Sequence, residues 1–301
     1  MVPPQVFIKS TLGYTLVEDP TSFNHFLHFK RQIFSMEPML NMALRAARKG
    51  AEVLQKNSQH RDVLKIEEKA KNDYVTEMDK AVEKEILYHL RKAYPDHQFI
   101  GEESGASEQQ SDYQWFIDPI DGTTNFIYGI PHFAISIGCF YKGKPEHAVI
   151  LDPSKQEEFT ASRGQGAKLN GRRIRVSQRK GLSGALLATG IPFNDSTMIH
   201  IKAYLDGMEE VLQQECSGIR RMGAASLDLA YVAAGRLDGY WEMNLKPWDM
   251  AAGILLIQEA GGFIGDFVGG NSMMESGNIV CGNNKVFKPL LSIVGRHLKH
   301  V

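Results

Sequence analysis

The stretch WFIDPIDGTTNF, residues 115–126, changes character in its middle. Its first residues, Trp115 to Ile117, are apolar and typical of a buried strand, whereas Asp118 and Asp121 follow at once and precede the small residues of the segment Gly122–Thr124. A turn around Pro119 explains two neighbouring acids as well as a functional site does, because Asp and Pro are both common turn residues. Both interpretations are open from this stretch alone.

Acids also lie at the edges of three other apolar segments: Asp79 after NDYVTEM, Glu102 and Glu103 after FIG, and Asp249 after KPW. Taken singly, Asp79 and Asp249 are typical of helix N-caps, and the two glutamates are typical of a solvated loop. Taken together with Asp118 and Asp121, they predict like charges converging in one cleft, where they would repel one another unless cations neutralised them.

The chemistry of these groups favours magnesium. Carboxylate oxygens without nearby Cys or His select Mg²⁺, which prefers a few carboxylates, waters and phosphate oxygens to a closed protein cage. Gly122 and the two threonines after it, Thr123 and Thr124, are expected to begin a helix and to offer backbone amides to an anion. Acids for a metal and amides for a phosphate together predict phosphate-ester chemistry.

Two competing phosphate-handling designs do not match. An aspartyl-phosphate hydrolase of the haloacid-dehalogenase type needs D-x-D, whereas this chain reads D-P-I-D, with one residue too many. The P-loop pattern G-x-x-x-x-G-K-[ST] is absent from the sequence. The segment GQGAKLNG is not a dinucleotide-binding fingerprint and is interpreted as a turn.

Composition describes a globular protein of 301 residues, with 43% hydrophobic and 23% charged residues. The formal net charge of −1 gives no electrostatic indication of nucleic-acid or anionic-membrane binding, and no apolar run is long enough to span a bilayer. The three cysteines, Cys139, Cys216 and Cys281, are odd in number and unclustered, which disfavours a disulfide framework or a zinc site. A cytoplasmic location is therefore expected.

Hydrophobic periodicity indicates where the regular elements lie. Residues 1–35 lack helical or strand periodicity and are expected to be a disordered or non-native extension, with the natural start at Met36. Helices are predicted at 36–57 and 77–94, short buried strands that run into carboxylates within 97–104 and 114–119, and a hairpin at 133–153 with its turn at Lys142 to Lys144. Further helices and strands interleave up to the C-terminus without a βαβ rhythm, which favours a layered α/β or α+β fold over a Rossmann domain.

The motifs DPIDGTTNF, GEES upstream and PWDMAAGILLIQEAGG downstream resemble the inositol monophosphatase family of Mg²⁺-dependent, Li⁺-sensitive phosphatases. The resemblance runs from about Met36 to the C-terminus. It implies an αβαβα sandwich over residues 36–301, built of two packed halves at about 36–178 and 179–301, and a homodimer that binds a small phosphate monoester.

The resemblance also implies roles for individual residues. Two or three Mg²⁺ ions per site would be held by Glu102, Asp118, the Ile120 carbonyl, Asp121 and Asp249, with Asp118 bridging two of them. Thr123 and Asp79 would polarise the attacking water, in a catalytic group with Glu102. The substrate would contact Gly122, Thr123, Thr124, Gly223, Ala225, Glu242 and Asp249.

Two functions follow from the resemblance and both are open. The first is hydrolysis of myo-inositol 1-phosphate and related polyol phosphates, for which Glu242 is the main residue-level support, since a carboxylate can accept hydrogen bonds from ring hydroxyls. Relatives acting on bisphosphorylated sugars, nucleotides or histidinol phosphate share the metal motif. The second is a role in ribosomal RNA transcription antitermination, through contact with Nus factors and RNA polymerase. This role is implied by the resemblance to a bacterial branch of the family, which is carried by TASRGQGAKLNGRRIR and LATGIPF.

Four remaining features have plainer interpretations. His132 is expected to be structural, and Trp248 to pack against the start of the helix that carries Asp249. The basic segment GRRIRVSQRK is more typical of a solvated strand edge than of a nucleic-acid patch. Lys71 and Tyr74 could border a weaker third metal site.

Overall fold

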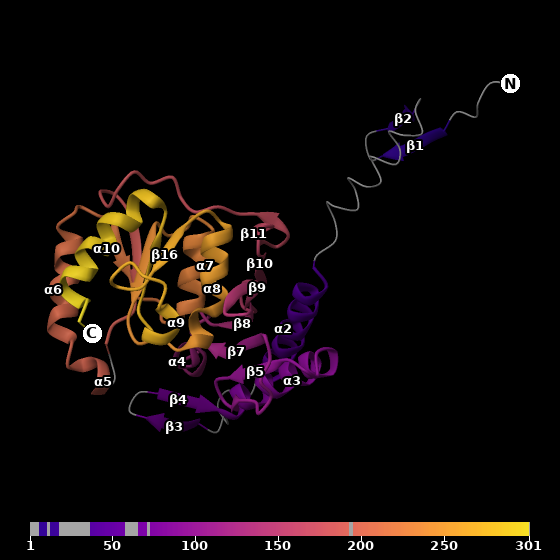
Figure 1. Ribbon diagram of the computed structural model, residues 1–301, viewed down its shortest axis with the longest axis horizontal. Helices are drawn as coiled ribbons and strands as arrows, with labels where there is room; N and C mark the ends of the chain where they lie inside the picture. The colour runs from indigo at the N-terminus through magenta and orange to yellow at the C-terminus, as the bar shows by residue number, and fades with distance from the viewer. Residues whose placement is uncertain are drawn as a thin grey trace. The chain divides into compact units, whose positions relative to one another are not determined.

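The computed structural model describes the backbone of residues 6–10, 13–17, 37–57, 66–70, 73–192 and 195–300. The chain divides into two units, Met1–Pro38 and Met39–Val301 (Figure 1). In the first unit, β1 (Val6–Ser10) and β2 (Gly13–Val17) pair antiparallel, a pairing that the irregular hydrophobic pattern of residues 1–35 does not predict. That residues 1–35 are a dispensable extension stays a prediction.

The second unit contains an eight-stranded sheet. Its strands lie in the order β12-β11-β10-β9-β8-β7-β5-β6, and every pair is antiparallel except β5–β7. The bounds are β5 (Gln98–Gly101), β6 (Gly105–Ala106), β7 (Tyr113–Asp121), β8 (Ala134–Tyr141), β9 (Lys144–Asp152), β10 (Glu157–Ser162), β11 (Gly166–Leu169) and β12 (Arg172–Arg173). The hairpin expected at 133–153 is confirmed, with Lys142 and Gly143 both at positive φ in its two-residue turn.

A second sheet has five strands in the order β14-β13-β15-β17-β16, with parallel pairs on both sides of β13. Its bounds are β13 (Leu186–Thr189), β14 (Gly218–Arg220), β15 (Gly239–Glu242), β16 (Phe263–Gly265) and β17 (Ile279–Gly282). A separate pair, β3 (Ile66–Ala70) and β4 (Asp73–Thr76), leads into α3.

Helices cover both sheets and fill the space between them. The longer ones are α2 (Pro38–Asn57), α3 (Glu77–Ala93), α6 (Ile201–Leu212), α7 (Ala225–Ala233), α8 (Pro247–Glu259) and α10 (Asn284–Leu298), and the short ones are α4 (Thr123–Ile127), α5 (Asp195–Met198) and α9 (Met273–Ser276). The helices predicted from periodicity at 36–57 and 77–94 correspond to α2 and α3.

The layers follow from what each helix touches. Strand β8 points Ile135 toward α2 and Gly138 toward α8, so helices cover both faces of the first sheet. Helices α7 and α8 lie side by side and contact both sheets, while α6 and α10 pack on the far face of the second sheet (Figure 1). The αβαβα sandwich implied by the resemblance is therefore confirmed.

Burial explains this order. Helices α7 and α8 are apolar almost all round, as expected of helices enclosed on two sides. Helices α2, α6 and α10 instead have one apolar stripe each and face solvent on the other side. None of the helices in the described ranges is long and apolar enough to cross a membrane. The three cysteines are free thiols.

Candidate active site

Strand β7 ends in an irregularity that presents Asp118 and Asp121. Asp118 pairs with Ser136 and Asp121 with Ala134 of β8, and the register shifts between them, so an extra residue bulges out of the strand. The Asp118 Oδ1 accepts the backbone N–H of Ile120 at 2.9 Å, which closes a small turn over Pro119. The turn interpretation of this stretch is thus correct as local structure, and it leaves both carboxylates buried at the same strand end.

The chain then turns sharply into α4. Gly122 precedes this helix at φ 92°, and a β-carbon there would lie 3.1 Å from the His132 carbonyl oxygen and 3.2 Å from that of Gly223. Only glycine fits both the left-handed backbone and this close approach. Thr123 and Thr124 form the first turn of α4, with Thr124 exposed.

Thr123 and Asp79 meet across 44 positions of sequence. The Thr123 hydroxyl lies 3.2 Å from Asp79 Oδ1 and 3.0 Å from the Ile120 carbonyl oxygen, two acceptors for its single proton. The other Asp79 oxygen accepts the backbone N–H and the hydroxyl of Thr76, at 2.7 and 2.6 Å. Asp79 is therefore the third residue of α3 in a capping box with Thr76, rather than the N-cap itself.

Asp249 has the matching position in α8. Its Oδ2 accepts the Lys246 backbone N–H at 2.7 Å, again from the third residue of the helix. The helix start is held against the first sheet by Ser136, whose hydroxyl donates to the Trp248 carbonyl at 3.2 Å. Trp248 packs beside Phe116 and Phe140, as expected of a packing residue.

Four acids influence one another's titration at this edge of the sheet. Burial raises the pKa of Asp118 well above its ordinary value, and the negative charges of Glu102, Asp121 and Asp249 raise it further. Burial likewise raises the pKa of Asp249, with the charge of Asp121 as the next cause. Glu102, Asp118, Asp121 and Asp249 are therefore near enough for their charges to interact, and that they join Asp79 and Glu103 in one metal-binding cleft stays a prediction.

These acids fit a cation by their chemistry. Within the described ranges, Asp118, Asp121 and Asp249 have no salt bridge to any basic side chain, so their charges lack a protein counter-ion. No three His, Cys, Asp or Glu side chains of the described residues form a ready-made metal group. Mg²⁺ does not need one, because it commonly keeps waters and substrate oxygens beside one or two carboxylates. The donor set therefore suits Mg²⁺ better than a caged metal.

Asp121 connects the first sheet to α7. Its Oδ2 accepts the Ser226 backbone N–H at 2.7 Å and also the Ser226 hydroxyl, and its Oδ1 accepts the Ala225 N–H at 3.2 Å. Burial raises the pKa of Asp121, and these hydrogen bonds act against that rise. The carboxylate thus lies at the positive end of α7, next to Gly223 and Ala225 of the expected substrate contacts.

Glu242 ends β15 in a narrow space. Its carboxylate accepts the Tyr240 hydroxyl, and a β-carbon on Gly190 would lie only 1.9 Å from its Oε1. Burial raises the pKa of Glu242 to about 7, the nearby Arg221 opposes this, and the charge of Asp121 adds to it. Glu242 is therefore close enough to Asp121 for the two charges to interact.

Three supporting residues were missed from the sequence: Thr76, Ser226 and Glu83. Thr76 could have been found, because T-x-x-D at 76–79 is a capping-box pattern. Glu83 interrupts the apolar stripe of α3, but only the structure shows that it is buried there. Nothing in the sequence around Ser226 indicates that it binds a carboxylate 105 positions away.

His132 is partly buried and its ring contacts Tyr231 edge-on, while its buried Nε2 has no hydrogen-bond partner among the described residues, so its structural role stays a prediction. The side chains of Lys71 and Tyr74, expected near a third metal, lie outside the described residues. The first strand of GRRIRVSQRK, β12, is an exposed edge strand, in agreement with the plainer interpretation.

Comparison with known proteins points to one family. The model of the "Inositol monophosphatase family" matches residues 35–297. The chain is 58% identical over 266 residues to "Nus factor SuhB" of Pseudomonas aeruginosa, covering 87% of this chain and 98% of that protein. Among solved structures it resembles the extragenic suppressor protein suhB of Bartonella henselae, at 42% identity and a TM-score of 0.82, over 88% and 100% of the two chains. The inositol monophosphatase of Anabaena matches at 35% identity and a TM-score of 0.75, over 87% and 98%.

Proposed function

The chain belongs to the inositol monophosphatase family, and from this premise we propose that its carboxylate site hydrolyses phosphate monoesters with Mg²⁺ and that its main cellular role is that of a Nus factor. The first part rests on the geometry of the site. The second rests on relatives at 49–58% identity that are named Nus factor SuhB.

The observation that carries the phosphatase proposal is that Asp118 and Asp121 are buried and, within the described ranges, form no salt bridge, beside a Thr123 hydroxyl that lies 3.2 Å from Asp79 Oδ1. Glu102, Asp118, Asp121, Asp249 and the Ile120 carbonyl would hold the metal. Bound Mg²⁺ would neutralise these acids, make a bound water more acidic and balance charge on the phosphoryl oxygens. Local hydrogen bonds hold the backbone or the carboxylate of each of these residues, and their side chains would converge on the metal as it binds.

The protein's own contribution to proton transfer is the pair Thr123 and Asp79. The Thr123 oxygen can orient a water and accept its proton while passing its own proton to Asp79 Oδ1, 3.2 Å away. Burial raises the pKa of Asp79, which makes its carboxylate a better proton acceptor than an exposed aspartate. No nucleophilic side chain is required, because in-line displacement depends on positioning and charge neutralisation.

For the substrate we propose myo-inositol 1-phosphate and related polyol phosphates. Gly122, Thr123 and Thr124 would receive the phosphate, and Gly223, Ala225 and Glu242 the polyol. Tyr240 donates to one oxygen of Glu242 and fixes its orientation, which leaves the carboxylate able to accept a ring hydroxyl. Inhibition by Li⁺, a homodimer and a cytoplasmic location complete this proposal.

The test of the enzyme is phosphate release with Mg²⁺, with and without Li⁺, from inositol 1-phosphate, fructose 1,6-bisphosphate, 3′-phosphoadenosine 5′-phosphate and histidinol phosphate. We expect Mg²⁺-dependent release that is highest for inositol 1-phosphate. Absence of phosphate release from all four substrates would overturn the enzyme proposal. A trapped phosphorylated aspartate would instead contradict direct attack by water and indicate an aspartyl-phosphate mechanism.

Asp121→Asn separates the two proposed roles. It removes a charge from the metal site, and we expect phosphatase activity to fall below detection while the Nus-factor role persists, since contact with Nus factors or RNA polymerase needs a surface. Asp112→Asn is the matched control, because Asp112 is exposed and forms a salt bridge with the equally exposed Lys142. Loss of the cellular transcription phenotype in the Asp121 variant alone would tie that role to the metal site.

A further inference from the structure

Glu83 is a buried carboxylate on α3. It is 2% exposed and lies one helical turn after Asp79. Within the described ranges it forms no salt bridge, although an unpaired buried charge is costly. Its two oxygens must therefore be satisfied in another way.

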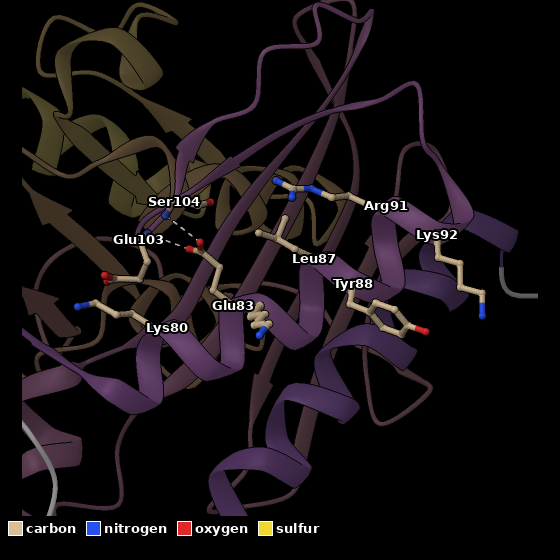
Figure 2. Close-up of a pocket in the computed structure, with 9 residues that line it drawn as sticks. Lys80, Glu83, Leu87, Tyr88, Arg91, Lys92, Glu103 and Ser104 are labelled. Atoms are coloured by element: carbon tan, nitrogen blue, oxygen red, sulfur yellow. Dashed lines mark hydrogen bonds between the residues drawn. The ribbon is translucent and has the colours of Figure 1, made fainter.

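Both oxygens accept backbone amides of the loop between β5 and β6. Glu83 Oε2 accepts the Glu103 N–H and Oε1 accepts the Ser104 N–H, each at 2.9 Å. Figure 2 shows the Glu83 side chain reaching from the helix to these two amides beside the groove that Lys80 also lines. Hydrogen bonds to an ionised acceptor are stronger than neutral ones, so one side chain anchors two consecutive loop residues.

The residue before these two is Glu102. Its own N–H donates to the Ile117 carbonyl of β7 at 3.1 Å, which anchors the loop on its other side. Glu102 thus lies between an anchor on β7 and an anchor on Glu83, and its charge acts on Asp118. Movement of the loop at Glu103 and Ser104 would move Glu102 relative to Asp118.

Gly101 shows how closely the Glu83 carboxylate is packed. A β-carbon on Gly101 would lie 2.5 Å from Glu83 Oε2 and 2.6 Å from its carboxyl carbon. The φ of Gly101 is not in the left-handed region, so close contact, rather than backbone strain, requires glycine here. An alanine at this position would displace the carboxylate from the loop amides.

We propose that Glu83 is a positioning residue for Glu102, which fixes the GEES loop and so sets the affinity of the site for its divalent cation. This rests on the proposed function, in which Glu102 binds Mg²⁺. Residues that orient metal ligands without touching the metal typically change metal affinity roughly 10- to 100-fold when replaced.

The test compares Glu83→Gln and Gly101→Ala with the parent and with Glu85→Gln. The control makes the same chemical change on the same helix at a half-exposed residue that pairs with His89. Glutamine keeps one acceptor oxygen but turns an amide group toward the other loop N–H, leaving that donor unpaired. Alanine at 101 displaces the carboxylate without altering its charge.

Isothermal titration with MgCl₂ alone measures affinity directly. We expect both test variants to bind Mg²⁺ at least roughly tenfold more weakly than the parent, and the control to be unchanged. In phosphatase assays, kcat at saturating Mg²⁺ should return to within about threefold of the parent, because the ligands themselves are intact. A merely structural role would lower kcat without a shift in Mg²⁺ affinity.

Parent-like Mg²⁺ affinity in either folded test variant, with folding checked by circular dichroism, would overturn the role of Glu83. If Glu83→Gln does not fold, the Mg²⁺ affinity of Gly101→Ala alone tests the role of Glu83. A parent protein that neither binds Mg²⁺ nor releases phosphate would overturn the proposed function instead, so the two failures are distinguishable.

Discussion

Gly138 lies at a close contact between the first sheet and α8, the helix that carries Asp249. A β-carbon at this position would lie 2.6 Å from the Ala251 Cβ, 2.8 Å from the Ala252 nitrogen and 2.9 Å from the Ala251 carbonyl carbon. Ordinary contacts begin near 3.4 Å, so Gly138→Ala forces a separation of about 1 Å. Two of the three opposing atoms are backbone, which cannot rotate away.

The displacement has to fall mainly on the helix. Strand β8 is held on both sides, with Gly138 paired to Phe116 of β7 and to Ala148 of β9. A glycine replaced by alanine without a clash usually gains about 0.4–1 kcal/mol through the unfolded state. Overpacking costs about 1–3 kcal/mol. We therefore expect a net loss of about 1 kcal/mol in the free energy of unfolding, whereas the same change without a clash would raise it.

The effect on activity should exceed the effect on stability. A shift of about 1 Å in α8 moves Asp249 relative to Asp118, and misplacement of that size can cost up to about 100-fold in rate. The assay is urea unfolding, with the slope against denaturant as a check on two-state behaviour, together with kcat/KM for phosphate release.

Gly181→Ala is the matched control, since its φ is not positive and nothing lies within 4 Å of an added β-carbon. It should be neutral or slightly stabilising. A Gly138→Ala protein as stable and as active as the parent would refute the contact and its link to Asp249.

Two further predictions concern the supporting groups. Thr76→Val removes the hydroxyl that donates to Asp79 and accepts the Met78 N–H. We expect the free energy of unfolding in urea to fall by about 0.5–2 kcal/mol and kcat to fall as well, whereas Thr76→Ser should keep the parent stability and kcat. Unchanged stability in Thr76→Val would contradict the capping role. Glu242→Gln tests the raised pKa of Glu242, which is about 7 in the folded protein against an ordinary 4.5. Because the folded state then binds the proton more tightly than the unfolded state, the metal-free parent should lose stability as the pH rises from about 4.5 to about 7. The variant should lose less stability over the same range. Identical pH profiles of the parent and the variant in EDTA would contradict the shift.

Local signals in the sequence predict much of this protein. Helices α2 and α3 follow from their apolar stripes, and the hairpin of β8 and β9 from a turn at Lys142 and Gly143 between two apolar runs. The strand that ends in Asp118 and Asp121 is also visible, because the change from apolar to acidic residues occurs within one short segment. The motifs around these acids are long enough to indicate the family, which the comparisons confirm.

Strand β13 (Leu186–Thr189) was not predicted, although it is the strand to which both β14 and β15 pair. It has four residues and is buried almost throughout, so it shows no alternation that periodicity could detect. Helix and strand patterns report which residues face away from solvent, and they carry no information about which element covers them.

The same limit applies to the site. The sequence could list Asp79, Asp118 and Asp249 as acids of interest, but only packing brings α3, β7 and α8 to one point, through contacts such as that of Gly138 with Ala251. The hydrogen bonds of Asp121 to α7 and of Glu83 to the GEES loop join residues 104 and 20 positions apart. Side-chain type and local spacing are written in the sequence, whereas the short distances that let one carboxylate orient another arise only when separate layers close on a common core.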